Sequence, residues 1–299
     1  IILNAFAIAL IGLIGRYAFR AWLPAITCQL APFMSSIVLK HAFLPKPEAL
    51  LVFSTCLLIT LILCRLPSRP IIKRQNTLAI LFGILSGFIL ATKITACPLL
   101  VLPLFLLRGI RARVIFGIWT ILAFLFFFLP AIDAINQFFE WLKRVSTGTG
   151  NHGGGERGFI TFEQYSTAFL KILKRPSLKI PLVTSFICLA ITTWRLKQGD
   201  NRNTDEARVL AAISAAQIAQ VGLVAKQATA FYMIPSYMLA SVSLLFSARL
   251  LWHAKPNTWN IPLSGNTIAK AMLIIFFISQ ISSMNKLAIH FQSLRTDAA

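Results

Sequence analysis

The stretch that decides the fold class is residues 114–132, which read VIFGIWTILAFLFFFLPAI and contain no charged side chain. A helix needs about 20 mostly apolar residues to cross the hydrocarbon core of a bilayer. Working outward from this stretch, similar apolar runs occupy residues 1–15, 21–39, 49–64, 76–92, 94–107, 180–194, 209–225, 229–248 and 267–285. The sequence therefore predicts an all-α, polytopic transmembrane helical bundle of about nine to ten spans, with one long Gly-rich outer loop.

The composition agrees with this fold class. Hydrophobic residues make up 57% of the 299 residues, and only 13% are charged. Soluble domains carry about 25% charged residues, so the chain has too little polar surface for a soluble enzyme fold. The net charge is +20, but the basic residues lie in short loops rather than on one face. We interpret them as a topology signal and an attraction to anionic lipid headgroups, and we expect no nucleic-acid partner.

The basic loops also predict an orientation. Lys93 separates the runs 76–92 and 94–107, and Pro98 and Pro103 favour a break between them over one long tilted helix. If both runs cross, four basic groups fall on one side, which the positive-inside rule makes cytoplasmic. These groups are Arg16 with Arg20, residues 65–74, residues 108–113 and residues 195–208.

The same count assigns the domain organisation. Residues 1–299 form a single transmembrane domain, and residues 133–179 form an extracytoplasmic loop region within it. The chain opens at Ile1 inside an apolar run that would pass from outside to inside. We therefore expect an N-terminal helix and a first outer loop to precede it.

The outer region contains a run with six glycines among 14 residues, 146–159, which cannot hold a helix. Glycine allows the backbone to approach a ligand closely, and His152, Glu156 and Arg157 could supply a base, an acid and a phosphate ligand. With Trp141, we take His152 and Arg157 as candidate substrate contacts of this loop. The alternative is a flexible linker between two helices.

Two lysines stand at membrane depth between apolar runs. A charge there is costly, so Lys93 is expected to face a cavity or a partner such as a lipid phosphate. Lys226, with Tyr232 nearby, could present a cation and a hydroxyl to an anionic headgroup. The alternatives are a lysine that snorkels at a helix end and an interfacial anchor.

Carboxylates that could act as bases on the outer side include Glu48, Asp133 and Glu156, although ordinary loop or helix-start charges would look the same. The four histidines and five cysteines show no metal-ligand spacing, so no metal residues are assigned. The sequence names no cofactor and leaves a divalent cation open.

Three motifs together resemble a known family. They are Pro45-Lys46-Pro47-Glu48 before a helix, the stretch Gly83–Thr95 with its Gly-x-x-x-Gly and Thr-Lys elements, and Lys226 followed by Phe231-Tyr232-Met233-Ile234-Pro235. This order resembles the GT-C membrane glycosyltransferases, in particular the dolichyl-phosphate-mannose protein mannosyltransferase and aminoarabinose-transferase branch. The loop from Trp141 to Phe159 is similar to a segment of uncharacterised bacterial members.

The resemblance implies an enzyme that moves a sugar from a polyprenyl-phosphate donor to a protein, lipid or glycan acceptor on the periplasmic face. It implies that Lys93, Lys226 and Tyr232 meet the donor phosphate. It places the catalytic acid in the first outer loop, upstream of Ile1, with Glu48, Asp133 and Glu156 as weaker candidates. The expected location is the bacterial inner membrane with the active face outward, and the expected partners are membrane lipid and the lipid-linked donor.

Two other classes of function remain open at this point. A transporter or flippase for a lipid-linked or anionic substrate would also place cations at membrane depth, although its usual paired halves are not visible. A non-catalytic subunit of an envelope assembly would use the same fold and would tolerate replacement of the Gly-rich loop.

Overall fold

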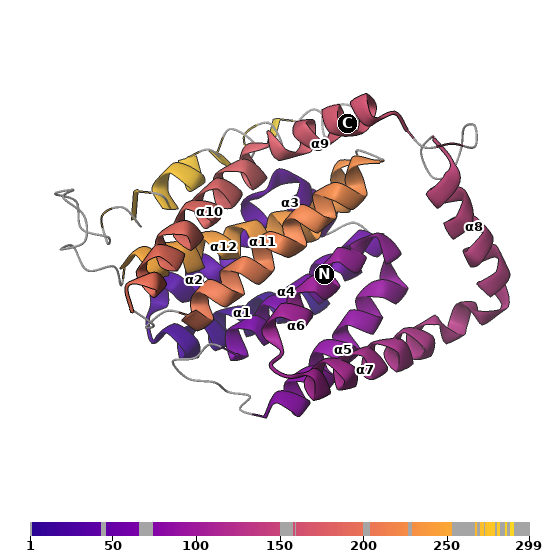
Figure 1. The fold of residues 1–299 in the computed structure, drawn as a ribbon, viewed down its shortest axis with the longest axis horizontal. Helices are drawn as coiled ribbons and strands as arrows, with labels where there is room; N and C mark the ends of the chain where they lie inside the picture. Colours follow the sequence, from indigo (N-terminus) through magenta and orange to yellow (C-terminus); the bar gives the residue numbers. More distant parts are fainter. Residues whose placement is uncertain are drawn as a thin grey trace, which may run out of the picture.

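The computed structural model describes residues 2–42, 46–65, 74–149, 158, 160–199, 204–226 and 229–252, together with separate helical residues between 267 and 289. Its elements are all helices, which confirms the predicted fold class (Figure 1). In chain order they are α1 (Ile2–Phe19), α2 (Trp22–Leu30), η1 (Ala31–Met34), α3 (Ser36–Ala42), α4 (Pro47–Cys64), α5 (Gln75–Thr92), η2 (Ile94–Leu100), α6 (Val101–Leu106), α7 (Ile110–Phe128), η3 (Leu129–Ala134), α8 (Ile135–Thr147), α9 (Phe162–Leu173), α10 (Pro176–Lys197), α11 (Thr204–Ala225), η5 (Ala230–Met233) and α12 (Ile234–Trp252).

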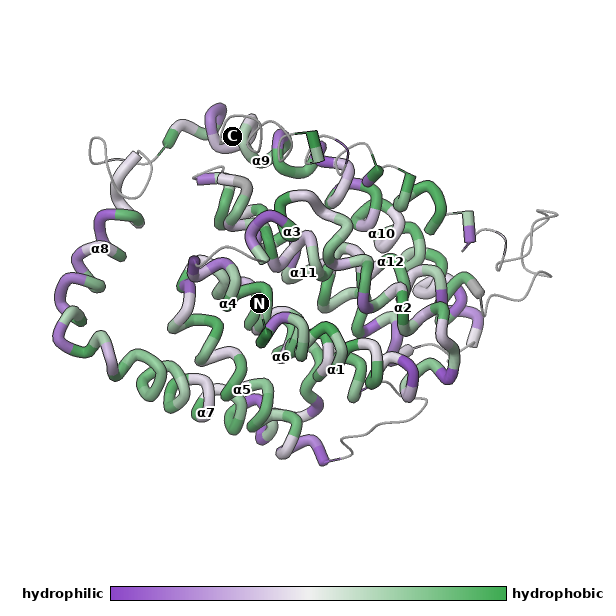
Figure 2. The backbone as a smooth tube through the Cα atoms, turned by 180° about the vertical axis from the view of Figure 1, so that it is seen from behind, coloured by the Kyte–Doolittle hydropathy of each residue, from purple (hydrophilic) through white to green (hydrophobic). Residues whose placement is uncertain are grey.

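Seven helices of the described chain are long and apolar enough to cross a membrane, and an eighth span results if the bent segment α2–η1–α3 counts as one. The chain is therefore a multi-pass membrane protein. The bend measures 85° and falls inside the predicted run 21–39. The structure thus has up to eight spans, where the sequence predicts nine to ten. Two predicted runs account for the difference, because 94–107 forms a shorter helix and 267–285 lies partly outside the described residues. Figure 2 shows apolar residues along the long helices and polar residues mainly near their ends.

The short segment η2–α6 nevertheless returns along α5. It starts beside Lys93, where α5 ends, and the backbone N–H of Arg108, just after α6, donates to Gln75 Oε1 at the start of α5, over 3.2 Å. A 3₁₀ helix rises about 2.0 Å per residue against about 1.5 Å for an α-helix, so fewer residues cover the same distance. The break that Pro98 and Pro103 favoured is present, and the predicted run 94–107 forms a shorter apolar segment that runs back along α5.

Close packing of α5 against α7 depends on two glycines. A Cβ atom at Gly83 would lie 2.6 Å from the Cβ of Trp119, and one at Gly87 would lie 2.6 Å from the Cβ of Ala123. No real side chain tolerates such contacts, so only glycine allows the two backbones to approach this closely. The Gly-x-x-x-Gly spacing at 83–87 therefore acts here as a helix-packing motif.

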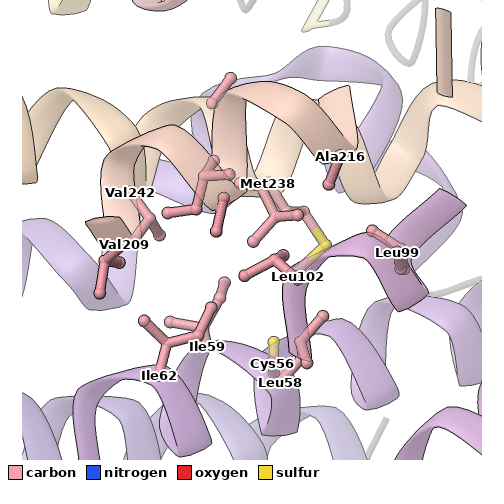
Figure 3. Close-up of a cluster of buried hydrophobic side chains, with 14 of the residues drawn as sticks. Cys56, Leu58, Ile59, Ile62, Leu99, Leu102, Val209, Ala216, Met238 and Val242 are labelled. Carbon is pink, nitrogen blue, oxygen red and sulfur yellow. The ribbon is translucent and has the colours of Figure 1, made fainter. Parts of the chain in front are cut away.

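The core forms around α12, of which 94% of the spanning window is buried. Met238 and Val242 of this helix meet Val209 of α11, Leu102 of α6 and Ile59 of α4 in an apolar cluster (Figure 3). Such dry packing fixes the relative positions of α4, α6, α11 and α12, and these helices carry or adjoin the polar residues at both ends of the bundle.

Polar residues gather at both ends of the bundle. At the first, called here the Lys93 end, lie Glu48 at the start of α4, Lys93 after α5 and Tyr232 before α12. At the second, called the Arg249 end, lie Glu206 at the start of α11 and Arg249 near the end of α12.

The Arg249 end gathers members of all four basic groups that the sequence placed on one side. Arg108 pairs with Asp205, and Arg208 donates to the carbonyl oxygen of Phe105 over 2.7 Å. Burial lowers the pKa of the nearby Arg65 guanidinium from its ordinary value, and the Asp205 carboxylate opposes this change. The guanidinium of Arg249 lies over the ring of Phe19, the last residue of α1, which places the end of α1 with Arg16 here as well.

The predicted loop region 133–179 is mainly helical where it is described. It comprises the end of η3, the helices α8 and α9, and the start of α10. Helix α8 has no buried residue and extends away from the other helices, joining α7 to the loop before α9 (Figure 1). Helix α9 is attached to the bundle through Tyr165, whose hydroxyl donates to the carbonyl oxygen of Gly222 over 2.8 Å.

Candidate functional site

The candidate site is built on a break in the chain at Lys93. Helix α5 ends at Thr92, whose hydroxyl donates to the Phe88 carbonyl oxygen over 2.8 Å. Lys93 then takes an extended conformation, with φ −160° and ψ 104°. Pro98 has no N–H to offer the carbonyl of Ile94, so a regular α-helix cannot resume directly after the break. The backbone therefore places the lysine side chain at a helix end instead of along a lipid-facing surface.

The ammonium of Lys93 pairs with the carboxylate of Glu48. Both side chains are largely buried, with 14% and 10% of their surfaces exposed. Glu48 lies in the first turn of α4, where the helix dipole favours a negative charge. A buried carboxylate and a buried cation each need a partner, and the pair satisfies both.

Aromatic rings complete the surroundings of the cation. The Lys93 ammonium lies 4.5 Å from the centre of the Phe231 ring and 4.7 Å from that of Tyr232. His41 of α3 packs against Phe231, with ring centres 6.1 Å apart. The ammonium thus has one carboxylate and two aromatic faces as neighbours, and Glu48 accepts one of its three N–H groups.

A buried glutamine joins the two irregular segments that carry these groups. Gln220 of α11 donates to the carbonyl oxygen of Thr95 over 2.8 Å and to that of Tyr232 over 3.0 Å. Its side chain is fully buried. Because one buried amide donates to carbonyls of both irregular segments, Gln220 fixes the segments that carry Lys93 and Tyr232 relative to each other.

Lys93 and Tyr232 face a cavity of about 270 Å³. Its wall is mainly apolar and aromatic, with a few polar groups near the break in the chain. The lining residues are Pro47, Leu90, Ala91, Thr92, Lys93, Ile94, Thr95, Phe124, Phe128, Phe138, Trp141 and Tyr232. An apolar cavity with one cation suits a ligand that has both a hydrocarbon part and an anionic group.

Helix α8 forms one wall of this cavity through Phe138 and Trp141. Lys226 lies at the other end of α8, where its ammonium donates to the carbonyl oxygen of Val145 over 2.8 Å and also to that of Ser146. A cation at a helix C-terminus satisfies free carbonyls and complements the dipole. Lys226 thus tethers α8 to the end of α11 and does not line the cavity.

The other residues singled out from the sequence divide into two sets. Trp141 is brought to the cavity, whereas Asp133 lies in η3 with an exposed side chain. His152, Glu156 and Arg157 lie outside the described residues, as does most of the Gly-rich run. Of the three candidate carboxylates, the described structure brings only Glu48 to Lys93.

Sequence reasoning did not link Glu48 to Lys93 and did not single out Gln220. The sequence does contain a pattern that could have identified Gln220, because Gln217 and Gln220 are polar amides inside an otherwise apolar run. The link between Glu48 and Lys93 joins residues 45 positions apart and had no local signal.

The described residues contain no group of three or more His, Cys, Asp or Glu side chains that could hold a metal ion. Comparison with protein-family models, curated proteins and solved structures finds no match for the chain.

Proposed function

We propose that this membrane protein is a glycosyltransferase that takes a sugar from a polyprenyl-phosphate donor. The observation that carries the proposal is a buried lysine at the wall of a largely apolar cavity, at one end of a membrane-spanning bundle. A polyprenyl-phosphate sugar has the matching parts, namely a hydrocarbon chain, a phosphate and a polar sugar.

The charge of Lys93 gives the site its chemistry. During transfer, the acceptor oxygen forms a bond to the anomeric carbon of the sugar, and the bond from this carbon to the phosphate breaks. Negative charge develops on the leaving phosphate, and a cation fixed in a water-poor site stabilises it strongly. Two N–H groups of the Lys93 ammonium are not used by Glu48 and can bind phosphate oxygens.

Glu48 and Tyr232 have supporting roles in this proposal. Glu48 holds the lysine side chain at the cavity wall, and it is the described carboxylate that can receive the proton of the acceptor. The Tyr232 ring stacks beside the ammonium and limits where a phosphate can bind. Lys226 acts on α8 instead of on the donor.

The basic Arg249 end supports the orientation that we propose. Lys and Arg in short loops favour the cytoplasmic side, so in this proposal the Lys93 end faces outward, to the periplasm of a bacterial inner membrane. A lipid-linked donor on that side needs no nucleotide-binding domain, and the apolar wall between α5, α7 and α8 is where its hydrocarbon chain would lie.

The test is sugar transfer by the purified chain in proteoliposomes, with a labelled polyprenyl-phosphate mannose as donor and membrane extract as acceptor. Lys93→Met is expected to lower transfer by about 10²–10³-fold, the usual effect of losing one donor to a developing negative charge. Lys93→Arg should retain part of the activity because it keeps the charge. Arg111→Gln, an exposed basic residue outside the cavity, is the matched control and should transfer normally.

Two outcomes would contradict the proposal. Full transfer by Lys93→Met would remove the lysine from the reaction. Movement of the labelled lipid across the bilayer without a covalent product would favour a flippase, which the bend of 85° between α2 and α3 would also suit.

A further inference from the structure

A second cavity lies at the Arg249 end, remote from Lys93. Its volume is about 420 Å³, within the range of roughly 300–1,000 Å³ that is usual for small-molecule sites. Most of its wall is apolar, and two of its side chains are cationic. The lining residues are Phe19, Ala21, Leu23, Pro24, Thr27, Leu245, Ala248, Arg249, Lys270 and Leu273.

Arg249 is held in place but keeps hydrogen-bonding capacity. Its Nε donates to Glu206 Oε1 over 2.6 Å, and its guanidinium lies 5.2 Å from the centre of the Phe19 ring. No described residue accepts a hydrogen bond from its two terminal amino groups. A guanidinium fixed on one edge presents its remaining donors as a preformed fork for an oxyanion.

Lys270 supplies a second cation on the same wall. Its side chain is exposed and forms no ion pair with any described carboxylate. Arg20 directly precedes the lining residue Ala21, and the side chain of Arg16 lies over Trp22 at the same edge. The described lining contains two cations and no carboxylate, and Glu206 pairs with Arg249 from beside it, so the cavity favours an anion.

The apolar wall decides which kind of anion fits. Leu23 is 67% exposed and Trp22 is 66% exposed, which opens this side to the hydrocarbon of a surrounding bilayer. A soluble anion would gain nothing from Phe19, Leu245 and Ala248, whereas an acyl chain would bury apolar surface against them.

From these observations we infer that the cavity at the Arg249 end binds one anionic phospholipid from the adjacent leaflet. The phosphate binds the free edge of Arg249 and the ammonium of Lys270, and an acyl chain lies along Phe19 and Leu245. This site is independent of the transferase proposal, because it uses none of the residues at the Lys93 end.

The test uses the delipidated full chain in detergent micelles, with lipid binding followed by mass spectrometry of the intact complex. Phosphatidylglycerol and phosphatidylcholine with identical acyl chains are the two probes. A basic side chain near an anionic headgroup adds about 1 kcal/mol, so each cation should contribute about fivefold to the preference for phosphatidylglycerol. Lys270→Gln should therefore lower that preference about fivefold, and Arg111→Gln at the same end should not.

A second variant separates the acyl contact from the charge. Leu23→Trp fills the cavity from an exposed position, and it should weaken the binding of both lipids. Equal binding of the two lipids by the native chain would overturn the inference. So would unchanged binding by both variants, or displacement of the lipid by inorganic phosphate alone.

Discussion

Glu48 and Glu206 hold a cation from another element at opposite ends of the bundle, and the two arrangements are chemically alike. Each carboxylate lies in the first turn of a helix and is largely buried. Each partner cation, Lys93 or Arg249, lies beside an aromatic ring and a cavity. By ion-pair chemistry alone, the two ends could not be told apart.

The backbone distinguishes them. Arg249 belongs to the continuous helix α12, and its pair with Glu206 joins two neighbouring helices. Lys93 lies at a break between α5 and η2, and a buried glutamine holds that break against a second one before α12. A buried ion pair is thus a helix staple where the backbone is regular, and a candidate reaction site where irregular backbone places the cation at a cavity.

The largest expected effect on stability comes from the ion pair between Arg249 and Glu206, which joins α11 and α12. Arg249→Met leaves Glu206 buried without its cation, which should lower the free energy of unfolding by about 3–5 kcal/mol. A denaturant titration of the purified chain in detergent micelles measures this. The double variant Arg249→Met/Glu206→Met should recover most of the loss, because apolar residues can replace a buried pair. If the single variant unfolds as the native chain does, the pair is not a staple.

A smaller effect is expected from the glutamine that joins the two breaks. Gln220→Met removes the two hydrogen bonds to the carbonyls of Thr95 and Tyr232, at a net cost of about 1–3 kcal/mol for the pair. The change should also weaken the binding of polyprenyl phosphate, because Lys93 and Tyr232 lose their common support.

Gln217→Met is the matched control for Gln220→Met. Gln217 lies on the same helix, is fully buried and donates to the Ser236 carbonyl oxygen over 3.1 Å, but it touches neither break. It should lower stability while leaving binding unchanged. Equal effects of the two variants on binding would mean that the breaks do not need Gln220.

The smallest expected effect concerns α8. Lys226→Met removes the cation from the C-terminus of this helix, where such a charge contributes about 0.3–1 kcal/mol. Amide hydrogen exchange should become faster in residues 135–147, with little change elsewhere. Arg144→Gln, which breaks only an exposed pair with Glu140 on the same helix, should leave exchange unchanged. Unchanged exchange in Lys226→Met would show that α8 is held in another way.

Much of the fold could be predicted from the sequence because a bilayer imposes a simple rule on it. Uncharged runs such as 114–132 must be helices that cross the bilayer or nearly cross it. The prolines after Lys93 predict a break in the helix. The separate run 94–107 was expected, but its 3₁₀ segment was harder to predict, since hydropathy does not reveal which type of helix forms.

Less of the site could be predicted, because its contacts join distant parts of the chain. Lys93 stood out as a charge between apolar runs, but the Glu48 carboxylate that meets it comes from another helix. Lys226 looked similar in sequence, yet its partner is the end of α8, an element that hydropathy alone does not place. Local patterns identify which polar residues need a partner, and only packing shows which partner they find.

The central claim is that Lys93 binds the phosphate of a polyprenyl-linked lipid, in a cavity separate from the one that Arg249 lines. The most direct measurement compares the binding of polyprenyl phosphate and of polyprenol, which lacks the phosphate, to two double variants. The detergent micelles contain excess phosphatidylglycerol, which occupies the cavity at the Arg249 end. Lys93→Met/Glu48→Met should lose the preference for the phosphate, whereas Arg249→Met/Glu206→Met should keep it, and both should remain folded. A native preference for polyprenyl phosphate that persists in Lys93→Met/Glu48→Met would contradict the account.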